Sequence, residues 1–379
     1  MRCSRKVYLT CAVILVCASV GRSMASTSRL RAMGNETRII ADDTNLFVYP
    51  SVIVNYPEVI AEPFDNWGGV IYGLGEERNK VVAVMFQRPI RSAMELNELL
   101  SGKMRGRLSR ELEVNPWIDF MYGTRLRKDL SLATQLSYAY GAESNGTQTS
   151  GYAMEFKVGT TIGNMESKRV DLALGLNLQG FEDKTDSLTV KSKGGLGVAL
   201  DGRIFLPMSE TIRLIPLLEF AYGGIDVDPD ESAFVEVTGG LGANMNVGPF
   251  TQVVFGALLT MNTTKKTPAV GSETTDIELL LPKLMVGGET VVGSMRVRVG
   301  FERSAIFRTF EEVDEDGTID QRKSFDTAFN LEFGLGFTFG GMKLDGVMEK
   351  NLLRDGPHFI GGAAHGGGLF SGATITYTF

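Results

Sequence analysis

The two histidines of this sequence are its first candidates for chemistry. His358 and His365 both lie in the glycine-rich stretch 351–367, with Asp355 close to the first of them. An imidazole beside a carboxylate can activate a nucleophile, which in a hydrolase is commonly a serine or a cysteine. The stretch 351–367 contains neither residue type. We therefore expect no catalytic residue, and we rank an enzyme at the rim of the protein as the least favoured function.

Two acidic runs have spacings that also occur in calcium-binding loops. An EF-hand loop needs a glycine at its sixth position and a bidentate glutamate at its twelfth. Neither run meets this requirement, because Val237 stands at the glutamate position of the first and Gly317 comes too early in the second. We predict solvated loops, or loops that share divalent ions with lipopolysaccharide, and neither a metal site nor a cofactor. The runs are Asp226, Asp228 and Asp230, and Asp314, Asp316 and Asp320.

The first 25 residues have the layout of a signal peptide. Arg2, Arg5 and Lys6 precede an apolar run at 7–20, which is followed by small residues around Ala25. The run is shorter than the ~20 apolar residues of a membrane-spanning helix. All three cysteines lie in this leader, so the exported chain has no thiol for a disulfide or a thiolate metal site. A net charge of −7 without a basic tract argues against a nucleic-acid partner.

From residue 67 onward the chain repeats an alternation of apolar and polar residues with period two. Such alternation is typical of β-strands with one apolar face. The stretches run for about 9 to 15 residues, longer than usual sandwich strands and long enough to cross a bilayer at a tilt. A soluble sandwich is the alternative, but the apolar face extends over too many strands for one sandwich core. Clear examples are 152–159, 168–179, 294–301, 325–339 and 368–379.

The last alternating stretch ends on aromatic residues, Tyr377 and the terminal Phe379. We predict that this pair is the assembly signal for the barrel-insertion machinery of a bacterial envelope. The fold class that follows is all-β, an antiparallel transmembrane β-barrel. We expect it in the outer membrane of a Gram-negative-type cell, after signal-peptide export through the periplasm. Its surroundings there would be outer-membrane lipids and lipopolysaccharide.

Long and short connections alternate between the expected strands. The short ones include Gly288–Glu289, and the long ones include 89–114 and 303–323. This alternation is typical of surface loops and periplasmic turns. We predict about 14 strands, within a range of about 12 to 16, and closure leaves no sheet edge in lipid. The stretch 94–112 could form an amphipathic helix that either caps the mouth or catches an apolar ligand.

Two expected strands contain a proline, which cannot donate a hydrogen bond to the ladder. At Pro282 the apolar phase of strand 276–287 changes, which predicts a β-bulge. At Pro216 the phase of strand 211–223 continues unchanged, which predicts one missing ladder bond. That gap is either a local kink, the interpretation we favour, or an opening in the wall through which an apolar ligand leaves sideways.

The polar faces of the expected strands carry both signs of charge. A general porin for anions or cations would be expected to favour one sign. Mixed charges can instead pair across a narrow barrel, and about 14 strands suit a filled lumen better than a wide pore. The residues expected to line the lumen are Glu155, Lys157, Arg169, Asp171, Gln179, Asp201, Arg203, Glu219, Glu236, Arg296, Arg298, Asp326, Asn330 and Glu332.

Residues 26–66 do not follow the strand pattern. They contain Arg-Ala-Met-Gly at 31–34, Ala-Asp-Asp-Thr-Asn at 41–45 and Tyr-Pro-Ser at 49–51. The first two stretches resemble the amino-terminal signature of the outer-membrane long-chain fatty-acid transporter (FadL-like) superfamily, which includes the shuttle barrel of type IX secretion (PorV-like). The third departs from the family's "NPA"-like ending. The resemblance covers about a tenth of the exported chain and is more specific for architecture than for substrate.

The resemblance implies that 26–66 is a hatch or plug inside the lumen and that 67–379 forms the barrel. Asp42, Asp43 and Asn45 would belong to this hatch, with the aspartates bonded to turn amides or paired with lumen cations. The alternative is an ordinary periplasmic leader strand.

The function implied by the resemblance is binding or passive passage of small hydrophobic compounds. The rival is a non-transporting barrel that serves as a scaffold or a secretion shuttle. An apolar lining that continues from 26–66 to Pro216 would favour the first. A lumen packed with paired charges, together with a large surface platform at 303–323, would favour the second.

Overall fold

The computed structural model describes most of the chain from residue 27 onward. The signal-peptide prediction, the two histidines and Phe379 lie outside the described residues. Within those residues, every helix is too short or too polar to cross a membrane. The described ranges are 27–75, 77–102, 113–144, 148–164, 167–184, 189–227, 230–267, 272–314, 317–348 and 370–378.

The described chain is mostly β-structure. Its helices are α2 (Thr27–Arg31), the 3-10 helices η1 (Asp43–Phe47) and η2 (Pro50–Asn55), and α3 (Arg91–Gly102). The strands are β1 (Glu58–Glu62), β2 (Trp67–Leu74), β3 (Lys80–Phe86), β4 (Asn115–Arg127), β5 (Leu130–Ser144), β6 (Gln148–Gly163), β7 (Arg169–Lys184), β8 (Thr189–Pro207), β9 (Ile212–Val227), β10 (Asp230–Asn246), β11 (Thr251–Thr267), β12 (Glu273–Val292), β13 (Met295–Val313), β14 (Ile319–Phe339), β15 (Met342–Met348) and β16 (Phe370–Thr378).

The strands close into one antiparallel barrel in which β1 pairs with β16. The predicted fold class is therefore confirmed, with 16 strands, the upper end of the range of about 12 to 16. The additional strands are β1 and β2, so the wall begins at Glu58, inside the stretch expected to be plug. The five residues of β1 are too few for their alternation to predict a membrane-spanning strand.

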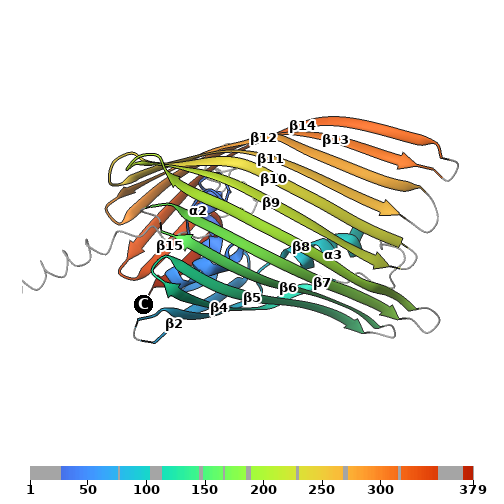
Figure 1. The fold of residues 1–379 in the computed structure, drawn as a ribbon, viewed down its shortest axis with the longest axis horizontal. Helices are drawn as coiled ribbons and strands as arrows, with labels where there is room; N and C mark the ends of the chain where they lie inside the picture. The colour runs from blue at the N-terminus through green and yellow to red at the C-terminus, as the bar shows by residue number, and fades with distance from the viewer. Residues whose placement is uncertain are drawn as a thin grey trace, which may run out of the picture.

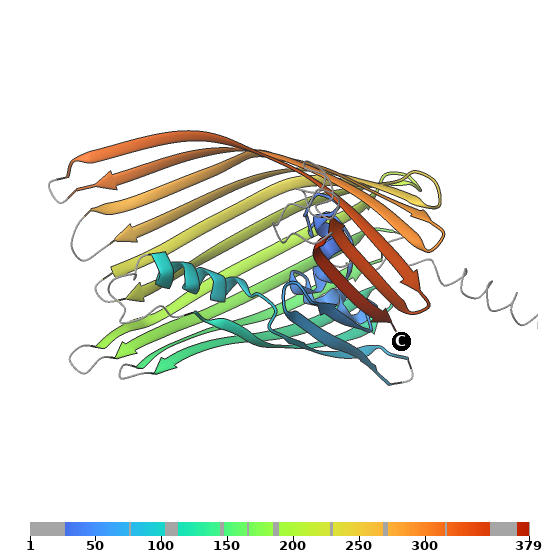
Figure 2. The same cartoon turned by 180° about the vertical axis from the view of Figure 1, so that it is seen from behind.

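The wall of the barrel is uneven in height. Strands β4 to β14 have 13 to 21 residues, whereas the five consecutive strands β3, β2, β1, β16 and β15 have five to nine. Figures 1 and 2 show the short strands together at one end, which also holds the N-terminal helices. We call this end the base and the opposite end the far end.

The expected tight turn at Gly288–Glu289 is wrong. Strand β12 continues to Val292, and the turn is made at Gly293 with a φ of +63°. Two successive glycines suggested a turn because glycine tolerates turn conformations. Gly287 instead faces the lumen, where a Cβ atom would lie 2.2 Å from the carbonyl oxygen of Met33. A close approach of two backbones, and not chain reversal, requires glycine at this position.

The expected loop at 303–323 is also wrong. Strands β13 and β14 continue as a hairpin whose pairing reaches Val313 and Ile319, and this hairpin extends furthest at the far end (Figure 1). Every residue from Ile319 to Phe329 is exposed. On the β14 side both faces are exposed as far as Phe329, and on the β13 side most residues after Ser304 are half-buried whichever way they face. Without one buried and one exposed face, no strict alternation identifies residues 303–323 as strands.

The two faces of the wall differ as the alternation predicts. On β7, Leu172, Leu174, Leu176 and Leu178 point outward and are 41–49% exposed, while Ala173 between them is buried. The same outward apolar positions recur on the neighbouring strands. A closed sheet with an apolar outer belt satisfies all of its wall hydrogen bonds internally, which is the requirement for spanning a bilayer.

Candidate functional site

The candidate site is the base of the lumen, where residues 27–56 fold inside the wall. We call these residues the lumenal segment. Helix α2 packs against β14, β15 and β16, and η2 packs against β4, β5 and β6. Figure 2 shows the segment enclosed behind the short strands. Its action as a hatch stays a prediction.

The motif residues of the lumenal segment build its turns. Asp42 caps η1, because its Oδ1 accepts a hydrogen bond from the Thr44 amide at 3.1 Å, and Asn45 Oδ1 accepts one from the Asp42 amide at 3.3 Å. This reciprocal arrangement satisfies donors at the start of the helix. Pro50 is the first residue of η2, where a missing amide hydrogen costs nothing. These motif residues therefore determine where the two short helices of the lumenal segment begin.

Glycines on the inner wall let the lumenal segment approach closely. Gly287 on β12 pairs with Gly300 on β13. A Cβ atom on Gly300 would lie 2.3 Å from the amide nitrogen of Gly34, and one on Gly334 would lie 2.5 Å from Ala32. Side chains at these positions would displace the turn that follows α2. The wall is therefore shaped to the backbone of the segment.

Two apolar clusters join the lumenal segment to the wall. One contains Leu46, Tyr49 and Val52–Val54 with side chains from β1 to β5 and β7. The other contains Leu30, Met33, Ile39 and Ile40 with residues of β8, β9, β11 and β12. Burial of such side chains stabilises docking by roughly 1.5–3 kcal/mol for each large one. The segment is thus held from both sides.

Asp171 is the centre of the first buried charge cluster. Arg169 donates to both of its carboxylate oxygens at 2.8 and 2.9 Å, and Arg203 donates to Oδ2 at 2.9 Å. Arg203 also donates to the carbonyl of Arg38 at 2.8 Å and to the Asn45 side chain. Its guanidinium lies 4.4 Å from the centre of the Tyr49 ring. One wall arginine therefore binds three parts of the lumenal segment.

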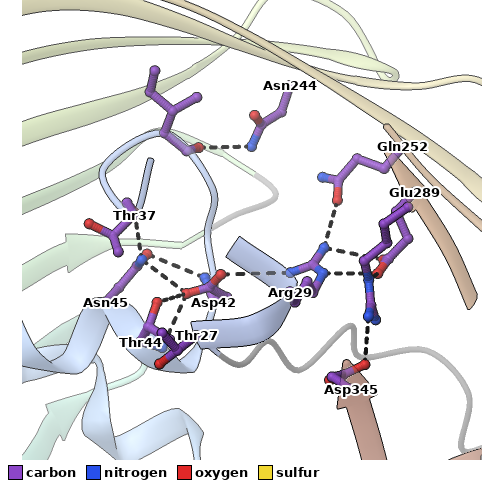
Figure 3. Close-up of polar contacts among 12 residues, drawn as sticks. Thr27, Arg29, Thr37, Asp42, Thr44, Asn45, Asn244, Gln252, Glu289 and Asp345 are labelled. Carbon is purple, nitrogen blue, oxygen red and sulfur yellow. Dashed lines mark hydrogen bonds and ion pairs between the residues drawn. The ribbon is translucent and has the colours of Figure 1, made fainter. Parts of the chain in front are cut away.

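Glu289 is the centre of the second cluster, which Figure 3 shows around Arg29. Its carboxylate accepts hydrogen bonds from Arg29 at 2.9 Å and from Arg298 at 2.6 Å. Arg298 also donates to Asp345 at 2.6 Å, and Arg29 Nη1 lies 3.8 Å from Asp42 Oδ2. Nearby carboxylates raise the pKa of Arg29 although its burial would lower it. This network connects α2 with η1 and with three wall strands.

Arg38 forms a third connection. It is hydrogen-bonded to Glu36 within the segment and to Glu219 on β9, while Lys283 on β12 lies 3.4 Å from Glu36. Burial alone would raise the pKa of Glu36, but the hydrogen bond and charge of Arg38 outweigh it, and the pKa lies below its usual value. Glu36 is therefore ionised whenever the segment is docked near neutral pH.

Two acidic residues at the start of η1 have raised pKa values, in contrast to Glu36. Burial raises the pKa of Asp42 to about 6, against the charge of Arg29. Burial, and then the charges of Glu58 and Asp42, raise the pKa of Asp43 well above its usual value. Asp43 and Glu58 face each other, and both are fully buried. Two carboxylates only accept hydrogen bonds, so a bond between them requires one proton.

Helix α3 covers the lumen toward the far end. Ile90, Ala93 and Leu96 pack with side chains of β5, β6, β7 and β9. The amide of Ser92 donates to Glu155 Oε1 at 2.8 Å, and Arg91 lies 3.3 Å from Glu236. The expected helix at 94–112 thus begins at Arg91, and residues 103–112 lie outside the described ranges.

The two wall prolines lie at different kinds of irregularity. The register of β12 with β13 shifts between Leu280 and Leu284, around Pro282. At Pro216 the register of β9 with β10 is continuous. On the other side, the pairing of β8 with β9 stops at Arg203–Leu217 and resumes at Leu206–Leu214. Pro216 therefore lies at an interruption of the ladder without a change of register.

The remaining predicted lumen residues differ in their relation to the lumenal segment. Gln179 is buried on β7, and Asp201 lies half-buried near Lys157. Lys157 itself reaches the segment, at 3.2 Å from the carbonyl oxygen of Phe47. Asn330 donates to Glu332 at 3.0 Å on β14, and Asp326 is exposed on the far hairpin.

Several residues of the site escaped the sequence interpretation. Arg29, Glu36 and Arg38 lie outside the three motif stretches. Glu289 falls in the expected turn at Gly288–Glu289. Asp345 lies on an alternating strand, but no motif marks it. A signal was available for the first three, because charged residues in a segment expected inside a lumen must find partners there.

No metal centre is evident in the described part of the chain, where no group of three or more His, Cys, Asp and Glu residues has a suitable arrangement.

Comparisons with known proteins add a fold-level similarity. No protein-family model matches the sequence, and no curated protein matches it. Among solved structures, the alcaligin outer-membrane receptor FauA of Bordetella pertussis matches with a TM-score of 0.38 and 7% identity over 76% of this chain and 67% of its own. The siderophore receptor PirA of Acinetobacter baumannii matches at 0.39 and 10%, over 76% of this chain and 61% of its own.

The FrpB iron transporter of Neisseria meningitidis matches with a TM-score of 0.41 and 8% identity, over 76% of this chain and 60% of its own. The chain thus spans about two thirds or less of the length of these three barrels. Likeness at this level concerns the barrel architecture alone and says nothing about what binds or passes. Membership of the fatty-acid transporter superfamily stays a prediction.

Proposed function

We propose that this protein is an outer-membrane barrel that binds or passively passes small apolar compounds, with the lumenal segment as its gate and no catalytic step. The observation that supports this is the second apolar cluster. It runs from Leu30 and Ile39 of the segment to Ile215 and Leu217 on β9, the two residues that flank Pro216. Apolar packing thus continues from the segment to the part of the wall where the ladder is interrupted.

The interruption has apolar side chains on its inner side. Phe205, on the β8 edge between the last and first paired residues, is fully buried in the same cluster. An apolar solute that displaced Ile39 would meet Phe205 and Ile215 next. The missing hydrogen bonds lower the cost of parting β8 from β9 at this level, because fewer backbone groups lose a partner.

Cysteine locks test whether the lumenal segment moves. The exported chain has no cysteine of its own, so an introduced pair forms a defined disulfide. Ser51 on η2 and Thr161 on β6 have hydroxyl oxygens 2.8 Å apart. We expect oxidised S51C/T161C to take up a fluorescent apolar probe into proteoliposomes at least about tenfold more slowly, and reduction to restore uptake.

A wall-to-wall disulfide is the matched control. Thr238 and Thr260 face each other across β10 and β11 with oxygens 2.9 Å apart, and T238C/T260C joins two strands that are already paired. Uptake through this variant should not depend on oxidation. Equal uptake by oxidised and reduced S51C/T161C would contradict a gating role.

Pro216→Val tests the exit. Valine supplies the missing amide hydrogen and suits a strand, so the barrel should become more stable and apolar uptake slower, with ion conductance unchanged. Pro282→Val at the bulge is the control and should leave uptake as it is.

The scaffold or secretion-shuttle function is the second candidate. The base filled with paired charges favours it, as does the hairpin β13–β14, where Phe325 and Phe329 are exposed. If neither the S51C/T161C lock nor Pro216→Val changes uptake, the scaffold or secretion-shuttle function is favoured over passage of apolar compounds.

A further inference from the structure

Arg296 is a buried lumen-facing arginine at the base, and none of the described residues forms an ion pair with it. It is the second residue of β13 and is 5% exposed. Its Nη1 atom is fully buried without a hydrogen bond, and within the described residues its guanidinium makes no ion pair. Burying an isolated charge is costly, and structures normally pair it. An unpaired guanidinium therefore requires an explanation.

The nearest carboxylates are already bound by other arginines. Arg296 lies opposite Gly336, which in turn lies opposite Asp345. Across that glycine Asp345 accepts from Arg298 at 2.6 Å. Glu289 is bound by Arg29 and Arg298. The network is thus complete without Arg296, which is left beside it.

The charges around Arg296 are of both signs. Glu289 and Asp345 attract its guanidinium, while Arg298 and Arg29 repel it. Arg298 also has a buried Nη2 atom without an acceptor. Arg296 and Arg298 are two positions apart on β13, so both face the lumen, and each has a buried guanidinium nitrogen without an acceptor among the described residues. An anion between these two guanidinium groups would reduce their mutual repulsion and supply the missing acceptors.

We propose that Arg296, together with Arg298, binds an oxyanion, a phosphate or carboxylate group, at the base of the lumen. The planar guanidinium matches two oxygens of such a group in a bidentate manner. The short connections lie at the base, so the base faces the periplasm if they are periplasmic turns, as the alternation of connections predicts. The group comes either from a small periplasmic anion or from the head of an amphiphile, and both sources share this chemistry.

The test compares two phosphate probes in a zwitterionic buffer of low ionic strength. The protein is held in an uncharged detergent, and thermal unfolding and calorimetric binding are measured with inorganic phosphate and with dodecyl phosphate. We expect saturable binding of at least one probe to the wild type, with a raised melting temperature. Arg296→Gln should weaken that binding by about tenfold or more. Binding of inorganic phosphate identifies a free anion, and binding of dodecyl phosphate alone identifies an amphiphile.

Arg213→Gln is the matched control, because Arg213 is a half-buried arginine near the start of β9, also at the base. It should bind the probes as the wild type does. Without phosphate, Arg296→Gln should be at least as stable as the wild type, since it removes an unpaired buried charge. The proposal is overturned if neither probe binds, if Arg296→Gln binds as tightly as the wild type, or if that variant is less stable without phosphate. Because no passage is measured, these outcomes are independent of the uptake experiments.

Discussion

The base and the far end of this barrel contain ion pairs of similar geometry in opposite surroundings. At the base, Arg298 lies 2.6 Å from Asp345, with the two side chains 0% and 3% exposed. On the far hairpins, Arg308 lies 2.6 Å from Glu278, with side chains 55% and 27% exposed. Water screens the second pair, which contributes ~0–1 kcal/mol, whereas breaking the first leaves a buried charge.

The comparison shows that distance alone says little about what holds this protein together. At the base, the charges connect the lumenal segment to several strands. Breaking one of these contacts leaves another buried charged group without its partner. At the far end, the ion pairs among the described hairpin residues join residues of the same strand or of adjacent strands. We therefore expect the base to unfold as one unit and the tips of the far hairpins to open independently.

The largest test of this difference removes one carboxylate from each region. Asp171→Ala strands two buried arginines and should lower the free energy of unfolding by ~3–5 kcal/mol. Asp320→Ala breaks the exposed pair with Arg322 and should change it by less than about 1 kcal/mol. Urea unfolding in lipid vesicles measures both. Similar losses in the two variants would mean that burial does not separate the regions.

Arginines placed on the outer face locate where the lipid belt ends. Leu174 is 49% exposed on β7, and Leu174→Arg should cost ~2–4 kcal/mol if it meets hydrocarbon near the midplane. Phe325 is 59% exposed on the far hairpin, and Phe325→Arg should cost ~0–1 kcal/mol, as near an interface. A larger cost for Phe325→Arg than for Leu174→Arg would mean that Phe325, and not Leu174, lies in the hydrocarbon layer.

One added methyl group tests the fit of the lumenal segment. Gly300→Ala places a Cβ atom 2.3 Å from the Gly34 amide nitrogen, and the overpacking should cost ~1–3 kcal/mol. Gly239→Ala on β10 is the control, because a Cβ atom there meets nothing within 4 Å, and alanine should be neutral or slightly stabilising. If Gly300→Ala is equally harmless, the lumenal segment does not pack against Gly300 in solution.

The sequence predicted the wall well where one face meets lipid. Leu172 to Leu178 alternate because lipid and lumen impose opposite polarities on successive residues. Residues 303–323 of the far hairpin escaped prediction because neither of its strands has one buried and one exposed face there. The end of β12 was misplaced because glycine serves both turns and close packing, and only the position of Met33 shows which applies at Gly287.

The site was predicted in part. Asp171, Arg203 and Arg298 were recognisable as inward charges from strand parity. Their partners were not, because pairing depends on which lumenal residue lies opposite, and sequence distance carries no information on that. Arg29 and Glu289 are 260 positions apart. The unpaired state of Arg296 was likewise invisible, since it depends on which neighbours take the available carboxylates.

The smallest expected effect is a pH dependence confined to the base. The pKa of Asp42 is about 6 and that of Asp43 is raised well above its usual value, chiefly by burial, while in an unfolded chain both lie near ~3.9. Between these values the folded state holds more protons, so its stability is greatest at low pH and falls as pH rises through the raised pKa values. Glu36, whose pKa is lowered, acts with the opposite sign, but below about pH 4.5.

We therefore expect the wild type to lose ~1 kcal/mol of stability between about pH 5 and pH 8. Asp43→Asn should flatten this dependence, because its amide can donate to Glu58 at any pH. Asp129→Asn, at an exposed position in the turn between β4 and β5, is the control and should keep the wild-type slope. Urea midpoints measured at several pH values give the result. If Asp43→Asn keeps the full slope, or if the wild type becomes more stable as pH rises, the proton does not lie between Asp43 and Glu58.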